Sequence, residues 1–136
     1  MKRYNDILRH DGPFWRQLAS LGAITCLMRG TIGEIVAVPD GADLSLEVLD
    51  ESAAIATACG YKPSKALLSR HAAAMTAPGS KLTSSMYRDL RKGAPVEADH
   101  ILGDLIERGD AHGVATRLLK AAFVNLRVYQ GGLQKR

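Results

Sequence analysis

The sequence predicts a single all-α domain of about six helices. Apolar residues recur at intervals of three and four along several segments, which is the spacing of a helix face. Glycine and proline cluster between those segments, while aromatic residues make up only 5% of the chain and runs of β-branched residues are few. A length of 136 residues suits one domain with a real core.

The first predicted helix is the most apolar segment of the chain. Residues 1–13 are polar and end in the breaker sequence Asp11-Gly12-Pro13, so we expect an N-terminal extension followed by a domain at 14–136. Apolar or small residues then occupy nearly every face between Phe14 and Met28, which predicts a central, buried helix. Gly30 and Gly33 are expected to interrupt or end it.

The second and third helices carry recognisable ends. One is expected from about Asp43 to Cys59, and Gly60 follows at the position that glycine favours after a helix. The next is expected to start at Pro63-Ser64, because proline fits a first turn, and to close at 77–80. The apolar run at 33–38 is also compatible with a strand, but a single strand has no partner here, so the prediction stays all-α.

A short fourth helix is expected after three hydroxyl residues that are all N-cap candidates. These are Thr83, Ser84 and Ser85, and the helix should end near Gly93. A fifth helix follows Pro95.

The fifth helix has acidic residues in its first turn, Glu97 and Asp99, where the helix dipole favours them. Gly109 and Gly113 are expected to break the chain after it. Thr116 should then cap the sixth helix.

The sixth helix is expected to end at Gly131-Gly132. The strongest core positions are the large aliphatic residues at helical spacing along the predicted faces. They are Leu18, Leu21, Val48, Ile55, Leu67, Leu102, Leu105, Leu119 and Leu126.

Charge and composition exclude several partner classes. The net charge is +4, from 18 basic and 14 acidic residues, but the basic residues are scattered and not interleaved with aromatics as in a single-strand binder. We therefore expect no nucleic-acid partner. No apolar stretch reaches the ~20 residues of a membrane span, and no apolar segment follows the basic N-terminus, so a cytoplasmic location is expected. Cys26 and Cys59 are expected to be free thiols.

Common enzyme signatures are absent from the printed sequence. It contains no GxGxxG, Walker loop, HExxH, CxxC or GxSxG motif. Glu97-x-x-His100, with Asp104 one turn on, is the most metal-like pattern, but a carboxylate-bridged metal site needs a second such motif. We therefore predict no metal site.

Ser85 and Glu97 have two interpretations. A hydroxyl and backbone N–H groups at a helix start can hold an anion, and a nearby carboxylate can orient a hydroxyl or an amine. Alternatively, Ser85 caps its helix and Glu97 is a surface acid matched to the helix dipole. On pattern alone the second interpretation is favoured.

One block of the sequence resembles a known family. Ser84-Ser85-Met86-x-x-Asp89-x-x-x-Gly93-x-Pro95-x-Glu97-x-Asp99, followed by Gly103 and His112-Gly113-Val114, resembles the C-terminal domain of the ketopantoate reductases. The segments 25–29 and 32–35 resemble the region of that domain's first long helix. The resemblance runs from about residue 14 to 130.

The resemblance implies a fold and a reaction. The family reduces 2-dehydropantoate to pantoate with NADPH, on the route to pantothenate. Its members pair a Rossmann domain with an all-helical domain shared with the 6-phosphogluconate dehydrogenase group. By motif, Ser85 matches the serine that holds the substrate carboxylate. Glu97 matches the carboxylate that holds the substrate hydroxyl near the catalytic lysine.

The chain departs from the family in two ways. It contains no glycine-rich loop, so no cofactor is expected to bind to this chain alone, although the family uses NADP(H). The lysine that would protonate the nascent alkoxide is also missing. Aligned on Trp15 its position is Gln17, and in the other register it falls near Phe14. In the Trp15 register, Leu21 and Thr25 stand where asparagines are expected, so no catalytic residue is assigned.

The sequence therefore supports two hypotheses. The chain is the substrate-binding and dimerisation domain of a ketopantoate reductase-like enzyme, inactive alone, or it is a non-catalytic helical interaction module. A fragment, half of a split enzyme and a degenerate paralogue all remain open. The expected partner is a separate Rossmann-domain protein or a second copy. A second copy is expected to bind through an apolar patch of Phe14, Trp15, Leu18 and Leu82, and the alternative is that residues 1–13 fold back and cover this patch.

Overall fold

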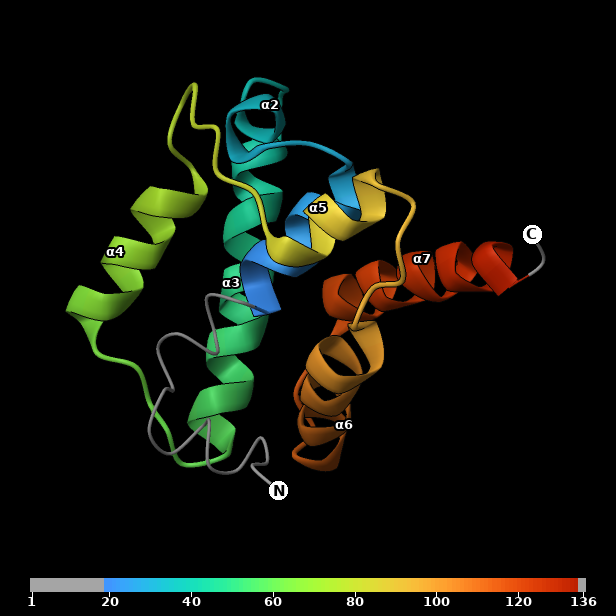
Figure 1. The fold of residues 1–136 in the computed structure, drawn as a ribbon. Helices are drawn as coiled ribbons and strands as arrows, with labels where there is room; N and C mark the ends of the chain where they lie inside the picture. The colour runs from blue at the N-terminus through green and yellow to red at the C-terminus, as the bar shows by residue number, and fades with distance from the viewer. Residues whose placement is uncertain (1–18, 135–136) are drawn as a thin grey trace.

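The computed structural model describes residues 19–134, and within this range every regular element is a helix (Figure 1). The all-α prediction is confirmed. The described part of the first helix spans residues 19–28. It is followed by α2 (Ile32–Val36), α3 (Gly41–Ala58), α4 (Lys65–Met75), α5 (Ser85–Arg91), the π-helix η1 (Asp99–Gly103), α6 (Asp104–Ala111) and α7 (Arg117–Gln134).

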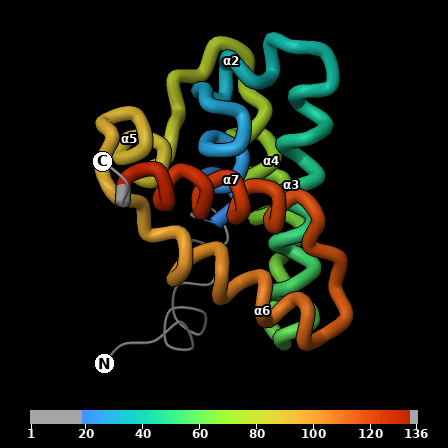
Figure 2. The backbone as a smooth tube through the Cα atoms, turned by 90° about the vertical axis from the view of Figure 1, so that its right-hand side faces the viewer, coloured from blue at the N-terminus to red at the C-terminus, as the bar shows by residue number. Residues whose placement is uncertain are grey.

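The first helix lies in the middle of the bundle, as its composition predicts. Residues 19–26 are all buried, and Figures 1 and 2 show this blue segment enclosed by later elements. Small residues permit the close packing: the methyl group of Met86 lies where a side chain at Gly22 would begin. Ser20 Oγ donates to Ser52 Oγ of α3 at 2.8 Å, which satisfies a buried hydroxyl.

The segment that was ambiguous between strand and helix is helical. The first helix ends at Arg29, which has a left-handed φ of 58°. A reciprocal capping box then starts α2: Glu34 N donates to Thr31 Oγ1 at 3.1 Å, and Thr31 N donates to Glu34 Oε1 at 2.8 Å. These hydrogen bonds lower the pKa of the Glu34 carboxyl below its ordinary value. Local capping therefore decides the helical conformation.

α3 is the helix against which most of the other helices pack. It contacts α2, α4, α6 and α7, and Figure 1 shows it running along the length of the molecule. Gly60 has φ 93° directly after its C-cap, as predicted for a helix-ending glycine. α3 begins at Gly41, where a Cβ would overlap the carbonyl of Ile35.

α4 differs from its prediction in two details. Ser64 is the N-cap, accepting from Leu67 N at 3.1 Å, so Pro63 precedes the cap and does not lie in the first turn. Leu67, expected in the core, is only half-buried. α4 packs mainly against α3 at the margin of the bundle, and therefore only His71 and Met75 in this helix are buried.

The predicted fifth helix is divided into η1 and α6, and Gly109 does not break it. Gly109 lies inside α6, where a Cβ would come 2.7 Å from Thr116 Cγ2 and 3.0 Å from Ile55. Its role is close packing, so the prediction of a break at this residue is wrong. Gly113, with φ 70°, is where the chain turns.

α7 continues to Gln134, so the predicted end at Gly131-Gly132 is also wrong. Its N-terminus is capped from another helix. Leu118 N and Leu119 N donate to the carboxylate of Glu51 in α3 at 2.9 and 3.0 Å. Thr116 directly precedes α7, and its hydroxyl donates to Asp110 Oδ1 at 3.3 Å.

Most of the predicted core is confirmed. Of the nine predicted residues, Leu67 is half-buried and Leu18 lies outside the described residues. The other seven are buried: Leu21, Val48, Ile55, Leu102, Leu105, Leu119 and Leu126. Both cysteines are free thiols, as predicted. Among residues 19–134, no helix is both long and apolar enough to cross a membrane.

Candidate functional site

Ser84 caps the N-terminus of α5, so the Ser85 side chain is not the cap. Tyr87 N donates to Ser84 Oγ at 3.0 Å, so Ser84 is the N-cap. The sequence left Thr83, Ser84 and Ser85 open as caps and also allowed a purely structural role for Ser85. The structure assigns that role to the preceding residue. Ser85 is the first residue of α5, and it is exposed.

A buried hydroxyl pair connects this N-terminus to the first helix. Thr25 Oγ1 donates to Leu21 O at 2.6 Å and lies 2.8 Å from Ser84 Oγ. Because Thr25 has one hydroxyl proton, which it gives to Leu21, Ser84 donates in the pair. No local sequence pattern predicts this contact, since its partners are 59 residues apart.

Glu97 lies in the segment between α5 and η1 and projects into solvent. Its neighbours Val96 and Ala98 are buried, and Val96 N donates to Gln130 Oε1 of α7 at 2.8 Å, which fixes the backbone. The Glu97 side chain is 75% exposed, and its Oε2 lies 3.8 Å from His100 Nε2. Within the described chain no hydrogen bond joins Ser85 to Glu97, so each presents its polar group separately to solvent.

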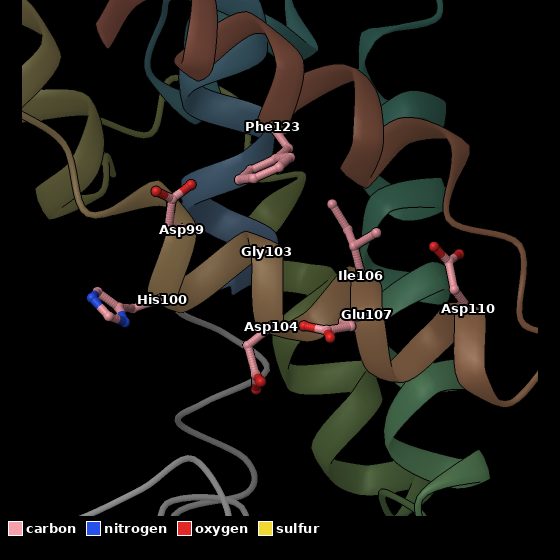
Figure 3. Close-up of a pocket in the computed structure, with 8 residues that line it drawn as sticks. All are labelled: Asp99, His100, Gly103, Asp104, Ile106, Glu107, Asp110 and Phe123. Atoms are coloured by element: carbon pink, nitrogen blue, oxygen red, sulfur yellow. The ribbon is translucent and has the colours of Figure 1, made fainter.

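A cavity of about 490 Å³ has four acidic residues in its lining, and the first of them, Asp99, is two residues after Glu97 (Figure 3). Figure 3 shows Phe123 of α7 above η1 and carboxylates around the rim. The cavity is lined by Asp99, His100, Gly103, Asp104, Ile106, Glu107, Asp110 and Phe123. Neither Ser85 nor Glu97 lines it, and its charge disfavours an anionic substrate.

Three of these carboxylates have basic partners. Arg108 pairs with Asp104 at 2.9 Å, Lys120 with Asp110 at 3.2 Å, and Arg127 with Asp99 at 3.4 Å. Across residues 19–134, no three His, Cys, Asp or Glu side chains are arranged to hold a metal ion. Two of these ion pairs join α7 to α6 and to η1, and the third lies within α6.

In the Trp15 register, Leu21 and Thr25 stand where the resemblance expects substrate-binding asparagines. Neither residue faces a site. Leu21 and Thr25 are buried, and the Thr25 hydroxyl is used inside the bundle. Gln17, at the expected lysine position, lies outside the described residues.

The fold matches that of solved reductases. A dimeric ketopantoate reductase from Staphylococcus aureus is 26% identical, with a TM-score of 0.73, over 88% of this chain and 42% of that one. A PanE/ApbA family ketopantoate reductase from Ralstonia eutropha, 21% identical, shares the fold with a TM-score of 0.77 over 90% of this chain and 41% of its own. The class is thus the helical domain of a ketopantoate reductase-type protein.

Sequence comparison defines the family. Residues 15–130 match the model described as "Ketopantoate reductase PanE/ApbA C terminal", and the chain belongs to this family. A 2-dehydropantoate 2-reductase from Pyrobaculum aerophilum is 36% identical over 112 residues, which is 80% of this chain and 40% of the relative. The chain therefore spans less than half the length of the relatives it matches.

Proposed function

We propose that this chain supplies the substrate-contacting part of an NADPH-dependent reductase that acts on 2-dehydropantoate or a related 2-oxoacid. In this proposal the Ser85 hydroxyl donates to the substrate carboxylate, and the Glu97 carboxylate accepts from the hydroxyl that forms. The observation that carries the proposal is the exposure of both residues, since Ser84 takes the capping role. Family membership supports the substrate class.

The described residues do not fit a dinucleotide. Nicotinamide cofactors bind where a glycine-rich turn joins a strand to a helix, so that backbone N–H groups meet the pyrophosphate. Residues 19–134 form helices and loops without a strand, and the sequence has no such glycine pattern. The proposal therefore assigns the cofactor to a different domain and predicts that this chain alone is inactive.

The test is reconstitution with a cofactor domain. Purified chain should show no NADPH binding by calorimetry and no turnover of 2-dehydropantoate. Fusion behind the unmatched N-terminal part of the Pyrobaculum relative should yield NADPH oxidation with that substrate. Ser85→Ala and Glu97→Ala should each reduce kcat/KM at least tenfold, whereas Ser69→Ala and Glu107→Gln, also at exposed positions, should not.

The missing proton donor can be tested in the same fusion. Positioned acid catalysis contributes about 10²–10⁴-fold, so Gln17→Lys should raise kcat substantially if residue 17 is the lysine position. Failure of the fusion with every 2-oxoacid, despite NADPH binding by its cofactor domain, would contradict the substrate-contacting role.

The second candidate is a non-catalytic self-association module. The observation that favours it is an exposed apolar face on α7, and the Staphylococcus aureus relative is dimeric. The apolar patch expected from the sequence gives less support. Phe14, Trp15 and Leu18 lie outside the described residues, and Leu82 is half-buried, with its carbonyl accepting from Ile32 N at 3.0 Å.

A further inference from the structure

The outer face of α7 exposes apolar side chains that the monomer does not use. Among the described residues, the exposed large apolar side chains are Met28, Val38, Val124 and Val128. Val124 is 59% exposed and Val128 is 72% exposed, one turn apart on the same helix. Figure 2 shows α7 crossing one side of the bundle with no other helix in front of it. Packing within the monomer gives no reason for two exposed valines on this face of α7.

The exposed valines belong to a regular ridge opposite the buried face. The ridge consists of Arg117, Ala121, Val124, Val128 and Gly131, at intervals of four, three, four and three residues. The opposite face of α7 carries the buried Leu119, Ala122 and Leu126. Alternate spacings of three and four are typical of a seam along which two helices pack lengthwise.

The ridge is complementary to itself when turned end for end. With Val124 at the centre, an antiparallel copy places Ala121 opposite Val128 and Arg117 opposite Gly131. On either side of the central Val124 pair, a large residue then faces a small one, which allows two helices to pack closely.

The glycines support this arrangement. A Cβ at Gly131 or Gly132 would meet nothing within 4 Å, so packing inside the monomer does not require glycine there. Glycine within a helix costs about 1 kcal/mol relative to alanine. Close approach of a second helix gives both glycines a physical reason.

The helix dipole favours the antiparallel orientation, although Lys135 and Arg136 also follow the end of α7 in the sequence. α7 has no acidic residue, and two of its basic residues, Lys120 and Arg127, are already paired with Asp110 and Asp99. Arg117 in the first turn would lie beside the carbonyl-rich C-terminal end of the other copy, where the helix dipole favours a cation. A parallel pair would instead bring the two Arg117 side chains together.

We infer that the outer face of α7 binds a second copy of this chain, as an antiparallel pair about a twofold axis near Val124. This inference deepens the self-association candidate and is independent of the reductase proposal. A twofold pair is the commonest way for a chain to bury such a face. One helix pair buries less than the roughly 1,200–2,000 Å² of a strong interface, so we expect a weak dimer.

Light scattering and sedimentation over a range of concentrations test the surface. The mass should rise from 14.6 kDa toward twice that value with concentration. Val124→Glu places like charges face to face at the axis and should weaken dimerisation at least tenfold. Val38→Glu, at a residue also 59% exposed but outside α7, is the matched control and should leave dimerisation unchanged. Circular dichroism melting of each variant checks that it is folded.

The outcomes separate the proposals. A monomer at every concentration would overturn both self-association and this surface. A dimer weakened by Trp15→Glu but not by Val124→Glu would keep self-association and overturn this surface. Loss of activity in the cofactor-domain fusion on Val124→Glu, with dimerisation unchanged, would assign the face to that other domain and also overturn the inference.

Cysteine cross-linking tests the orientation, in a Cys59→Ser background. Ala121→Cys mixed with Val128→Cys should form a disulfide-linked dimer, whereas neither variant alone should do so. Val124→Cys should cross-link to itself, and Val38→Cys should not. Self-linking of Ala121→Cys and of Val128→Cys, without linking in the mixture beyond that level, would contradict the antiparallel pair.

Discussion

Thr25 shows how one buried hydroxyl can organise a neighbouring helix. Its Oγ1 accepts from Ser84 while it donates to Leu21 O, so the N-cap of α5 is tied to the central helix. Ser85 follows directly on this anchored cap and gains a fixed backbone position from it.

Thr25→Val should destabilise the protein by about 1–3 kcal/mol. The substitution keeps the side-chain shape but leaves the buried Ser84 hydroxyl without its acceptor. Urea unfolding gives the free energy of unfolding, and Thr25→Ser is the control that keeps the hydroxyl. A Thr25→Val variant as stable as the unmodified chain would show that the hydroxyl pair contributes little.

The buried Cys26 thiol should lose its proton only at an unusually high pH. Burial raises the pKa of the Cys26 thiol from 9.0 to about 11, and the nearby Arg29 offsets this only in part. The unfolded chain loses this proton from about pH 9, while the folded chain holds it to about pH 11. The thiol therefore stabilises the fold below pH 9, and this contribution is lost as the pH rises to 11.

The measurement is the free energy of unfolding between pH 8 and 11 for the unmodified chain and for Cys26→Ala. The variant should lose less stability over this window, because other groups titrate equally in both proteins. Iodoacetamide should also label the partly exposed Cys59 before Cys26 in the folded state. Equal pH dependence in both proteins would contradict a raised pKa.

At the scale of the element, α7 depends on a cap from another helix. The Glu51 carboxylate accepts from Leu118 N and Leu119 N, which have no acceptor within their own helix. A negative group at this end also matches the helix dipole. The helix whose outer face carries the proposed interface is therefore fixed to α3 at its first turn.

Glu51→Ala should reduce stability by about 0.5–2 kcal/mol, the usual cost of losing an N-cap. Urea unfolding measures the change. Glu47→Ala, one turn earlier on α3 and exposed, removes the same charge without removing a cap and should change stability much less. Equal effects of the two substitutions would indicate general electrostatics and not capping.

Element boundaries show where local sequence signals fail. Gly60 ends α3 as predicted, because a left-handed C′ residue is a local requirement. Gly109 and the pair Gly131-Gly132 look similar in sequence, yet all three lie within helices. At Gly109 the reason is its close approach to Thr116 and Ile55, which becomes visible only when α6 is packed against α3 and the segment before α7.

At the scale of the whole molecule, the buried core lies apart from the surface residues to which functions are proposed. The first helix and α3 supply much of the buried core, whereas Ser85, Glu97 and the ridge of α7 lie at the surface. A domain that contributes contacts to a second body, whether a cofactor domain or another copy, presents its polar and apolar groups in this way.

The sequence by itself determined the all-α class, the location of most helices, the buried nature of the first helix and the family. These features follow from periodic apolar spacing and from cap residues, whose physical effects extend over only a few positions. The tertiary structure alone decided that Ser84 and not Ser85 is the cap, that Leu67 is marginal, that Glu51 caps α7, and that Val124 and Val128 face outward. Each of these depends on which residues meet across tens of positions, because burial and hydrogen bonding are properties of the packed bundle.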